Sequence, residues 1–287
     1  MVDIVPKNII LIFLLIIVFI IVFSFLTFIM SIKPGKWPIE FTPESFKLKY
    51  EDVTFESSDG LKLKGWFLPG NKSNDTIIVM HGYPTNKADV LPFSMFLLKK
   101  FNVFLFDFRS FGESEGSYTT AGFKEVKDLD AAVEYLKNRK DVENIGALGF
   151  SLGGSVAIMS KNNDVKAIVA DSAYSNLNNM IESMYRGFSF LKYPFVQLTR
   201  IYGKIFFGVD PKDVSAETAI KNIDKPVLII HGNKDSQIPV NEAIILHNAN
   251  KKTELWIVEN ADHGEIYALN KEEYEKRVFE FFEKNLG

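Results

Sequence analysis

The chain opens with one long apolar stretch. From Ile9 to Ile32, 24 residues carry no charge, and Ser24, Thr27 and Ser31 are the only polar side chains among them. About 20 apolar residues cross a bilayer as a helix, so the pattern predicts a transmembrane helix at about residues 9–32. A cleavable signal peptide has a shorter apolar core that ends in small residues, and a buried core helix rarely runs this long without a charge. We therefore predict a retained membrane anchor over residues 1–34.

The remaining residues, 35–287, predict one α/β domain. Two alternating segments, 50–56 and 61–68, flank Ser-Ser-Asp-Gly and indicate a β-hairpin. Short continuous apolar runs, typical of parallel strands buried on both faces, follow at Thr76–Met80, Val103–Phe106, Ile145–Phe150, Ala167–Ala170, Val227–Ile230 and Leu255–Val258. Helical patterns lie between them at Asp89–Lys100, Ala121–Arg139, Leu152–Asn162, Val240–Asn250 and Glu265–Leu286. This order predicts a mostly parallel central sheet flanked by helices, with its ligand site at the carboxyl ends of the strands.

An insertion at about residues 174–215 interrupts this alternation. It is too long for an ordinary connection and too rich in Phe, Tyr and Leu for a solvated loop. We interpret it as a helical cap that shapes an apolar acyl pocket. Contact with lipid beside the anchor is compatible with that interpretation, and plain core packing is the alternative.

Composition narrows the chemistry. The formal net charge of −3, from 33 basic and 36 acidic side chains, gives no sign of a nucleic-acid partner. The absence of cysteine excludes disulfides, thiolate metal sites and a cysteine nucleophile. We expect no cofactor and no metal.

The side of the membrane stays open. Only Lys7 lies near the N-terminal end of the apolar stretch, whereas Lys33, Lys36, Lys47 and Lys49 follow it. This count favours a cytoplasmic C-terminal side, but long folded domains cross membranes largely regardless of such a bias.

The most informative motif follows the Ile145–Phe150 run. Gly149-Phe150-Ser151-Leu152-Gly153 has the G-x-S-x-G spacing and stands between a predicted strand and a predicted helix. In that context a serine occupies a sharp, strained turn, and its hydroxyl is exposed above the sheet. Ser151 is therefore the candidate nucleophile.

A serine nucleophile needs a base and an orienting carboxylate. His263 follows the last predicted strand and precedes the last helix, so it is the candidate base, whereas His81, His231 and His247 suit structural roles better. The order Ser…Asp…His selects Asp235, which follows the penultimate strand. Asp171 is the alternative acid. Asp107 ends another strand, and Asp262 adjoins the histidine too closely to align with it.

These motifs resemble the α/β-hydrolase superfamily, and in particular its BEM46-like and serine-aminopeptidase-like group. The resemblance rests on His81-Gly82-Tyr83, the Phe106–Gly116 segment, Gly149–Gly154, His231–Asp235 and Asp262-His263-Gly264. It covers the chain from about residue 50 onward, except for the insertion. It implies an oxyanion hole made by the backbone amides of Leu152 and Tyr83. Ser110 departs from the family pattern, which usually has glycine there, and we expect this to affect loop shape.

We therefore predict a membrane-anchored serine hydrolase of the carboxylesterase, lipase or thioesterase kind, acting on a small-molecule or lipid acyl substrate. One alternative is an aminopeptidase-type amide hydrolase, which needs an acidic group such as Glu182 or Asp171 to hold a substrate ammonium. The other is a membrane-anchored binding protein with an idle triad. Oligomeric state and physiological substrate stay open.

Overall fold

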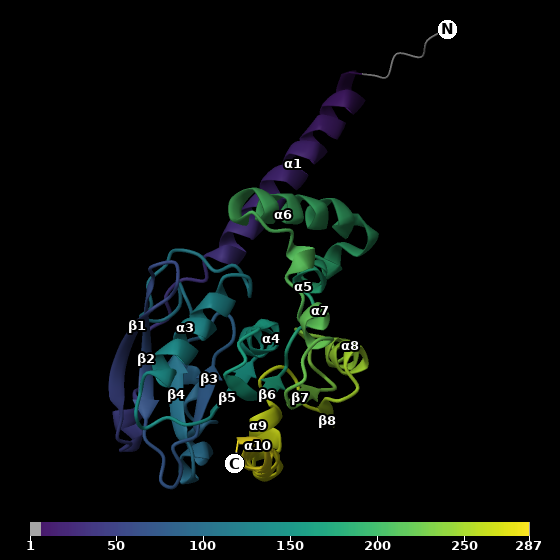
Figure 1. Ribbon diagram of the computed structural model, residues 1–287. Helices are drawn as coiled ribbons and strands as arrows, with labels where there is room; N and C mark the ends of the chain where they lie inside the picture. The colour runs from purple at the N-terminus through teal and green to yellow at the C-terminus, as the bar shows by residue number, and fades with distance from the viewer. Residues whose placement is uncertain (1–6, 287) are drawn as a thin grey trace.

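Eight strands form one sheet in the computed structural model, which describes residues 7–286 (Figure 1). The spatial order is β1-β2-β4-β3-β5-β6-β7-β8. The strands are β1 (Glu51–Glu56), β2 (Lys62–Leu68), β3 (Thr76–Met80), β4 (Asn102–Phe106), β5 (Ile145–Phe150), β6 (Val165–Asp171), β7 (Val227–Gly232) and β8 (Glu254–Val258). The β1–β2 and β2–β4 pairs are antiparallel and the other pairs are parallel, which confirms the predicted sheet.

Helices cover both faces of the sheet. One face packs against α3 (Glu125–Lys137), α4 (Leu152–Met159), α7 (Ala216–Ile220) and α8 (Asn241–Ala249). The other face packs against α2 (Lys87–Val90), η2 (Met95–Lys99), α9 (Ile266–Leu269) and α10 (Lys271–Leu286). Strands β3 to β7 are buried on both sides, as their continuous apolar sequences require.

The predicted helix Asp89–Lys100 is wrong as a single element. The chain forms only the short α2 and the 3₁₀ helix η2, with Pro92 between them. Proline lacks an N–H and crowds the preceding turn, so the helical pattern cannot continue through it. Helix α3 also begins later than predicted, because Ala121 and Gly122 adopt positive φ angles of 47° and 110°. The last predicted helix divides at Asn270 into α9 and α10.

Residues 174–215, called the cap below, lie between the sheet and the N-terminal helix (Figure 1). They form α5 (Leu177–Met184), η3 (Arg186–Leu191), α6 (Lys192–Phe207) and η4 (Pro211–Asp213). Helix α1 (Lys7–Ile32) projects from the body as a stalk, and α6 lies across its C-terminal part. By length and composition, α1 is able to cross a membrane.

A buried ion pair fixes the loop after β4. The Lys87 ammonium is fully buried and lies 2.7 Å from Asp107 Oδ2, and it also pairs with Glu113. The Lys87 backbone N–H donates to Asp107 Oδ1 at 2.8 Å, and the ammonium lies 4.6 Å from the centre of the Trp66 ring. The pair thus ties the start of α2 to the end of β4.

We expect Lys87→Ala to lower the free energy of unfolding by about 3–5 kcal/mol, because it leaves the Asp107 carboxylate buried without its partner. Urea unfolding of the full chain in detergent measures this loss. The matched control is Lys252→Ala, whose pair with Asp224 has side chains 78% and 93% exposed and therefore adds little. Equal stability of the two variants would show that the buried pair does not hold this loop.

Ser110, where the family usually has glycine, adopts a positive φ of 70°. Its side chain is buried, and its hydroxyl has no hydrogen-bond partner among residues 7–286. A left-handed backbone is strained for serine and free of strain for glycine. The departure thus lies at a turn position whose backbone conformation suits glycine.

Ser110→Gly should raise the free energy of unfolding by about 1 kcal/mol, since relief of the backbone strain exceeds the added entropy of the unfolded chain. Ser110→Ala removes the unpaired hydroxyl but keeps the strained φ. Denaturant midpoints of the two variants separate these contributions. A lower stability of Ser110→Gly than of wild type would contradict the inference that the Ser110 backbone is strained.

Candidate active site

The turn between β5 and α4 holds Ser151 in a strained conformation. Its φ and ψ are 52° and −111°, and its N–H donates to the Asp171 carbonyl at 2.7 Å. A Cβ on Gly149 would lie 2.2 Å from the carbonyl carbon of Gly153, so the strand and the helix approach too closely for any side chain at 149. The local geometry is the nucleophile elbow that the G-x-S-x-G motif predicts.

Three side chains distant in the sequence meet at this turn. His263 Nε2 lies 3.1 Å from Ser151 Oγ, and His263 Nδ1 lies 2.7 Å from Asp235 Oδ2. The other carboxylate oxygen of Asp235 accepts hydrogen bonds from the backbone amides of Gln237 at 3.0 Å and Ile238 at 2.7 Å. Asp235 is thus fixed on one side by its own loop and on the other by the imidazole.

The remaining histidines make structural contacts. His81 is fully buried, accepts a hydrogen bond from the Phe108 N–H at 3.0 Å and bonds the Gly82 carbonyl at 2.7 Å. Burial lowers the pKa of His81, which favours the neutral ring that accepts the Phe108 bond. His231 contacts the Ile238 carbonyl, and His247 contacts Thr253.

The alternative acids point elsewhere. Burial raises the pKa of Asp171, whose carboxyl group bonds Ser172 and the Tyr274 hydroxyl. The Asp262 carboxylate accepts hydrogen bonds from the backbone amides of Ser236 and His263, and these bonds lower its pKa. Asp107 belongs to the Lys87 pair. Of the four candidates, the structure brings only Asp235 to the His263 ring.

The two amides assigned to an oxyanion hole lie beside Ser151. Leu152 is the first residue of α4, where backbone N–H groups have no partner within the helix. Within residues 7–286, neither the Leu152 N–H nor the Tyr83 N–H donates to a protein acceptor. A Cβ on Gly82 would lie 3.1 Å from the Cβ of Ser151, so glycine lets the Tyr83 loop approach the serine.

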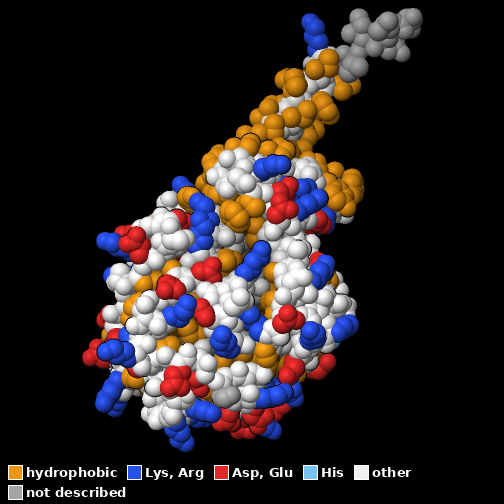
Figure 2. All heavy atoms as spheres, viewed as in Figure 1, with side chains coloured by type: hydrophobic (Ala, Val, Ile, Leu, Met, Phe, Trp, Pro, Cys, Tyr) orange, Lys and Arg blue, Asp and Glu red, His pale blue; other side chains and the backbone are white. Residues whose placement is uncertain are grey.

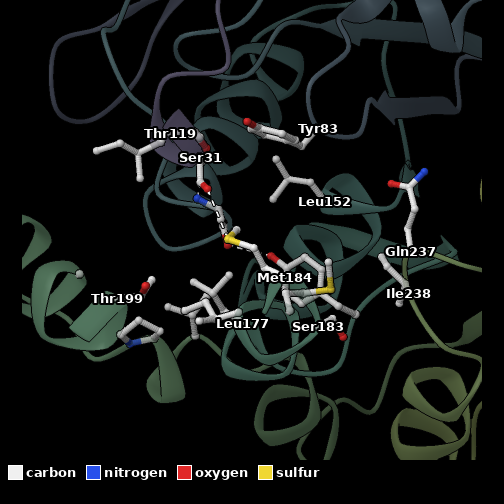
Figure 3. A pocket seen from close by; sticks show the side chains of 18 of the residues that line it. Ser31, Tyr83, Thr119, Leu152, Leu177, Ser183, Met184, Thr199, Gln237 and Ile238 are labelled. Atoms are coloured by element: carbon white, nitrogen blue, oxygen red, sulfur yellow. Dashed lines mark hydrogen bonds between the residues drawn. The ribbon is translucent and has the colours of Figure 1, made fainter. Parts of the chain in front are cut away.

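A cavity of about 680 Å³ opens above Ser151 and His263 (Figure 3). The cap supplies much of its wall, including Leu177, Met180 and Met184, and Tyr83 and Leu152 also line it. The lining is mostly apolar, and Arg186 is its one Lys or Arg within the described chain. No carboxylate lines it in residues 7–286: Glu182 pairs with Lys192, and Asp171 bonds Tyr274 behind the elbow.

Comparison with known proteins places this geometry in a family. The sequence model of the prolyl oligopeptidase family matches residues 113–287. The chain belongs to this family of α/β hydrolases. It is 30% identical to Bacillus subtilis YqkD over 250 residues, which are 84% of this chain and 82% of YqkD. It is 27% identical to Schizosaccharomyces pombe bem46 over 216 residues, covering 71% of this chain and 67% of bem46.

A solved structure agrees with this family assignment. The Pyrococcus furiosus esterase Pf2001 is 33% identical to this α/β hydrolase, with a TM-score of 0.76, over 90% of this chain and 99% of the esterase. The α/β-hydrolase and BEM46-like resemblance is confirmed, and the enzyme is a hydrolase of esterase-like type.

The sequence did not lead us to predict one part of the cavity wall of this α/β hydrolase. Phe28, Ser31 and Ile32 of α1 line the cavity together with the cap. A signal was present, because Ser24, Thr27 and Ser31 have the three- and four-residue spacing of one helix face. A membrane helix surrounded only by lipid has no need of a polar face.

Proposed function

We propose that this enzyme is a serine hydrolase that cleaves carboxylic ester or thioester bonds of apolar acyl substrates through an acyl-enzyme intermediate. The observation that carries the proposal is the His263 ring, which lies between Ser151 Oγ and Asp235 Oδ2. Acyl transfer by a serine needs this geometry, in which the base lies between the nucleophile and the orienting acid.

The reaction has two steps. His263 Nε2 takes the Ser151 proton as Oγ attacks the acyl carbonyl, and the N–H groups of Leu152 and Tyr83 stabilise the oxyanion. The imidazolium then gives that proton to the leaving alcohol or thiol as the acyl–oxygen or acyl–sulfur bond breaks. In the second step His263 activates a water molecule, which releases the carboxylic acid and restores Ser151. Asp235 holds the ring orientation and stabilises its positive charge in both steps.

The cavity supports an apolar acyl group as the part of the substrate that is bound. Its wall is mostly apolar and includes Phe28, Leu177, Met180, Ile181, Met184 and Phe207. An aminopeptidase-type reaction remains the second candidate, because the matching family model is named for oligopeptidases. That reaction needs a carboxylate for the substrate ammonium, and none lines the cavity in the described chain. The lining therefore favours esters.

We further propose that residues 1–34 are a retained anchor, and that residues 35–287 form the hydrolase domain with the cap at 174–215. Residues 1–6 lie outside the described part of the anchor. Retention is supported by the contacts of α1 with the cap, since Thr27 bonds Tyr185 at 2.5 Å and Tyr202 bonds the Ile21 carbonyl at 3.1 Å. Cleavage of α1 would remove part of the cavity wall.

Turnover of two substrate classes tests the proposed function. The full chain in detergent is assayed with p-nitrophenyl butyrate, octanoate and palmitate, and with aminoacyl p-nitroanilides beside them. We expect hydrolysis of the esters and none of the anilides. Hydrolysis of the anilides alone would assign the enzyme to the aminopeptidase type, and absence of both activities in folded protein would favour a binding role.

A further inference from the structure

Three polar side chains in the C-terminal half of α1 contact the cap. Thr27 Oγ1 lies 2.5 Å from the Tyr185 hydroxyl, which in turn lies 2.9 Å from Thr199 Oγ1 of α6. Ser24 is fully buried and lies 3.5 Å from the Tyr202 hydroxyl. The third polar residue, Ser31, contacts Met184 Sδ at 3.7 Å (Figure 3). The hydroxyls of these three residues also donate to carbonyls of α1 itself, and of their contacts with the cap the one between Thr27 and Tyr185 is the shortest.

Aromatic packing strengthens the same contact. Phe23 packs edge-on against Phe188 and Phe195, with ring centres 5.8 and 5.7 Å apart. Phe28 is buried against Tyr202, Phe206 and Phe207 of α6. At its C-terminal end, the Ile32 carbonyl accepts a hydrogen bond from the Thr119 N–H at 2.8 Å. Between Ile20 and Ile32, one face of α1 thus packs against the cap, and its last residue bonds the loop that precedes α3.

The same end of α1 forms part of the substrate cavity. Phe28, Ser31 and Ile32 line it on one side, and Ser151 and His263 line it at the base. An acyl chain that occupies this cavity from the reacting carbonyl outward therefore shares it with side chains of α1.

The length of α1 bears on where the cap would lie relative to a membrane. The apolar residues free of the cap, Ile9–Phe19, span about 16 Å at 1.5 Å per residue, whereas the hydrocarbon core is about 30 Å thick. If α1 crosses the bilayer, the remaining thickness lies at the level of η3 and α6. Six large apolar side chains are exposed there and suit a membrane-embedded surface: Phe190, Leu191, Tyr193, Ile201, Ile205 and Phe206. The exposed polar side chains at the same level are those of Arg186, Ser189, Gln197 and Lys204.

Figure 2 shows that the apolar surface of α1 continues onto the cap at its base, while charged side chains cover the body below. The charges of α6 suit this placement. Lys192 pairs with Glu182, and Arg200 pairs with Asp210, so both are neutralised within the cap. Lys204 has the long side chain that allows an ammonium to reach the headgroups from such a helix.

From these contacts we infer that the enzyme takes its substrate, a membrane-resident acyl ester with one chain, from the bilayer. The substrate enters at the junction of α1 with the immersed cap, and Phe28, Ser31 and Ile32 limit the length of its acyl chain. This inference rests on the proposed esterase function. It makes α1 a specificity-determining wall of the cavity as well as an anchor.

The preference of the enzyme for acyl chains of different length tests whether α1 forms a specificity-determining wall. The full chain is reconstituted in phosphatidylcholine nanodiscs, and the ratio of kcat/KM for 1-palmitoylglycerol to that for p-nitrophenyl butyrate is measured. We expect Ser31→Trp to lower this ratio by about tenfold or more, because the indole takes up cavity volume that a long acyl chain needs. Ile32→Ala should raise it. Met30→Trp, at an exposed position of α1 outside the cavity, is the matched control and should leave the ratio unchanged.

The outcomes separate this inference from the proposed function. If the wild-type enzyme hydrolyses neither ester and does not react with a fluorophosphonate, the proposed function itself is contradicted. A wild-type enzyme that hydrolyses both, with the same ratio in Ile32→Ala and in a Ser31→Trp variant that still reacts with the probe, overturns the inference. If Ser31→Trp does not fold, Ile32→Ala alone decides.

Single-cysteine variants test the immersion, since the chain has no native cysteine to interfere. An environment-sensitive fluorophore on Ile205→Cys and on Phe190→Cys should shift its emission to the blue in nanodiscs relative to the water-exposed dye. The same fluorophore on Lys251→Cys, on an exposed turn before β8, should not shift. Emission typical of water at both cap positions would overturn the immersed cap.

Discussion

Ser151→Ala is expected to lower kcat on esters by about ten-thousandfold or more, because it removes the atom that attacks the acyl carbon. KM should change little, since the cavity wall and the two proposed oxyanion amides stay in place. Within residues 7–286 the Ser151 hydroxyl forms a hydrogen bond only with His263, so its removal should not unfold the protein. Steady-state turnover of p-nitrophenyl butyrate measures the effect.

Ser160→Ala is the matched control for this substitution. Ser160 follows the other end of α4, where its hydroxyl bonds Asp130 at 3.0 Å, and it lies outside the cavity. Its loss should leave kcat within a few-fold of wild type. If Ser151→Ala retained the turnover of the control, the hydrolysis would have to occur elsewhere in the molecule.

Asp235→Asn is expected to lower kcat by about a thousandfold to ten-thousandfold, because an amide beside His263 Nδ1 favours the wrong ring tautomer and cannot stabilise an imidazolium. The amide oxygen can still accept from the Ile238 N–H, so the loop geometry should persist. The ratio of kcat values at equal folded concentration gives the effect.

Asp171→Asn is the decisive control, since Asp171 is the second acid that ends a strand near the elbow. Burial raises its pKa, and its partners are the Tyr274 and Ser172 hydroxyls, so an uncharged amide suits the same place. We expect activity within a few-fold of wild type. A large loss with Asp171→Asn and a small one with Asp235→Asn would reverse the assignment of the acid.

Much of this fold was readable from local sequence. The runs at Thr76–Met80 and Ile145–Phe150 are strands with the predicted bounds, because continuous apolar residues between turn signals suit few other environments. The order Ser151, Asp235, His263 was readable for a related reason: parallel strands present their carboxyl ends at one edge. The structure brings these three residues to that edge.

Other features depend on contacts between distant segments, which local patterns do not record. The Asp89–Lys100 prediction gave too little weight to Pro92, a local signal that was present. The wall formed by α1 is different, because it depends on where the cap places Tyr185, Met184 and Phe207. The sequence of α1 indicates only that one of its faces is polar.

One measurement tests the central claim most directly. The full chain in detergent is treated with a fluorophosphonate, digested, and analysed by mass spectrometry to locate the adduct, with His263→Ala beside the wild type. The account predicts one phosphonylated residue, Ser151, and little or no adduct in His263→Ala. An adduct on another residue, or none on folded wild-type protein, would contradict an activated serine at this elbow.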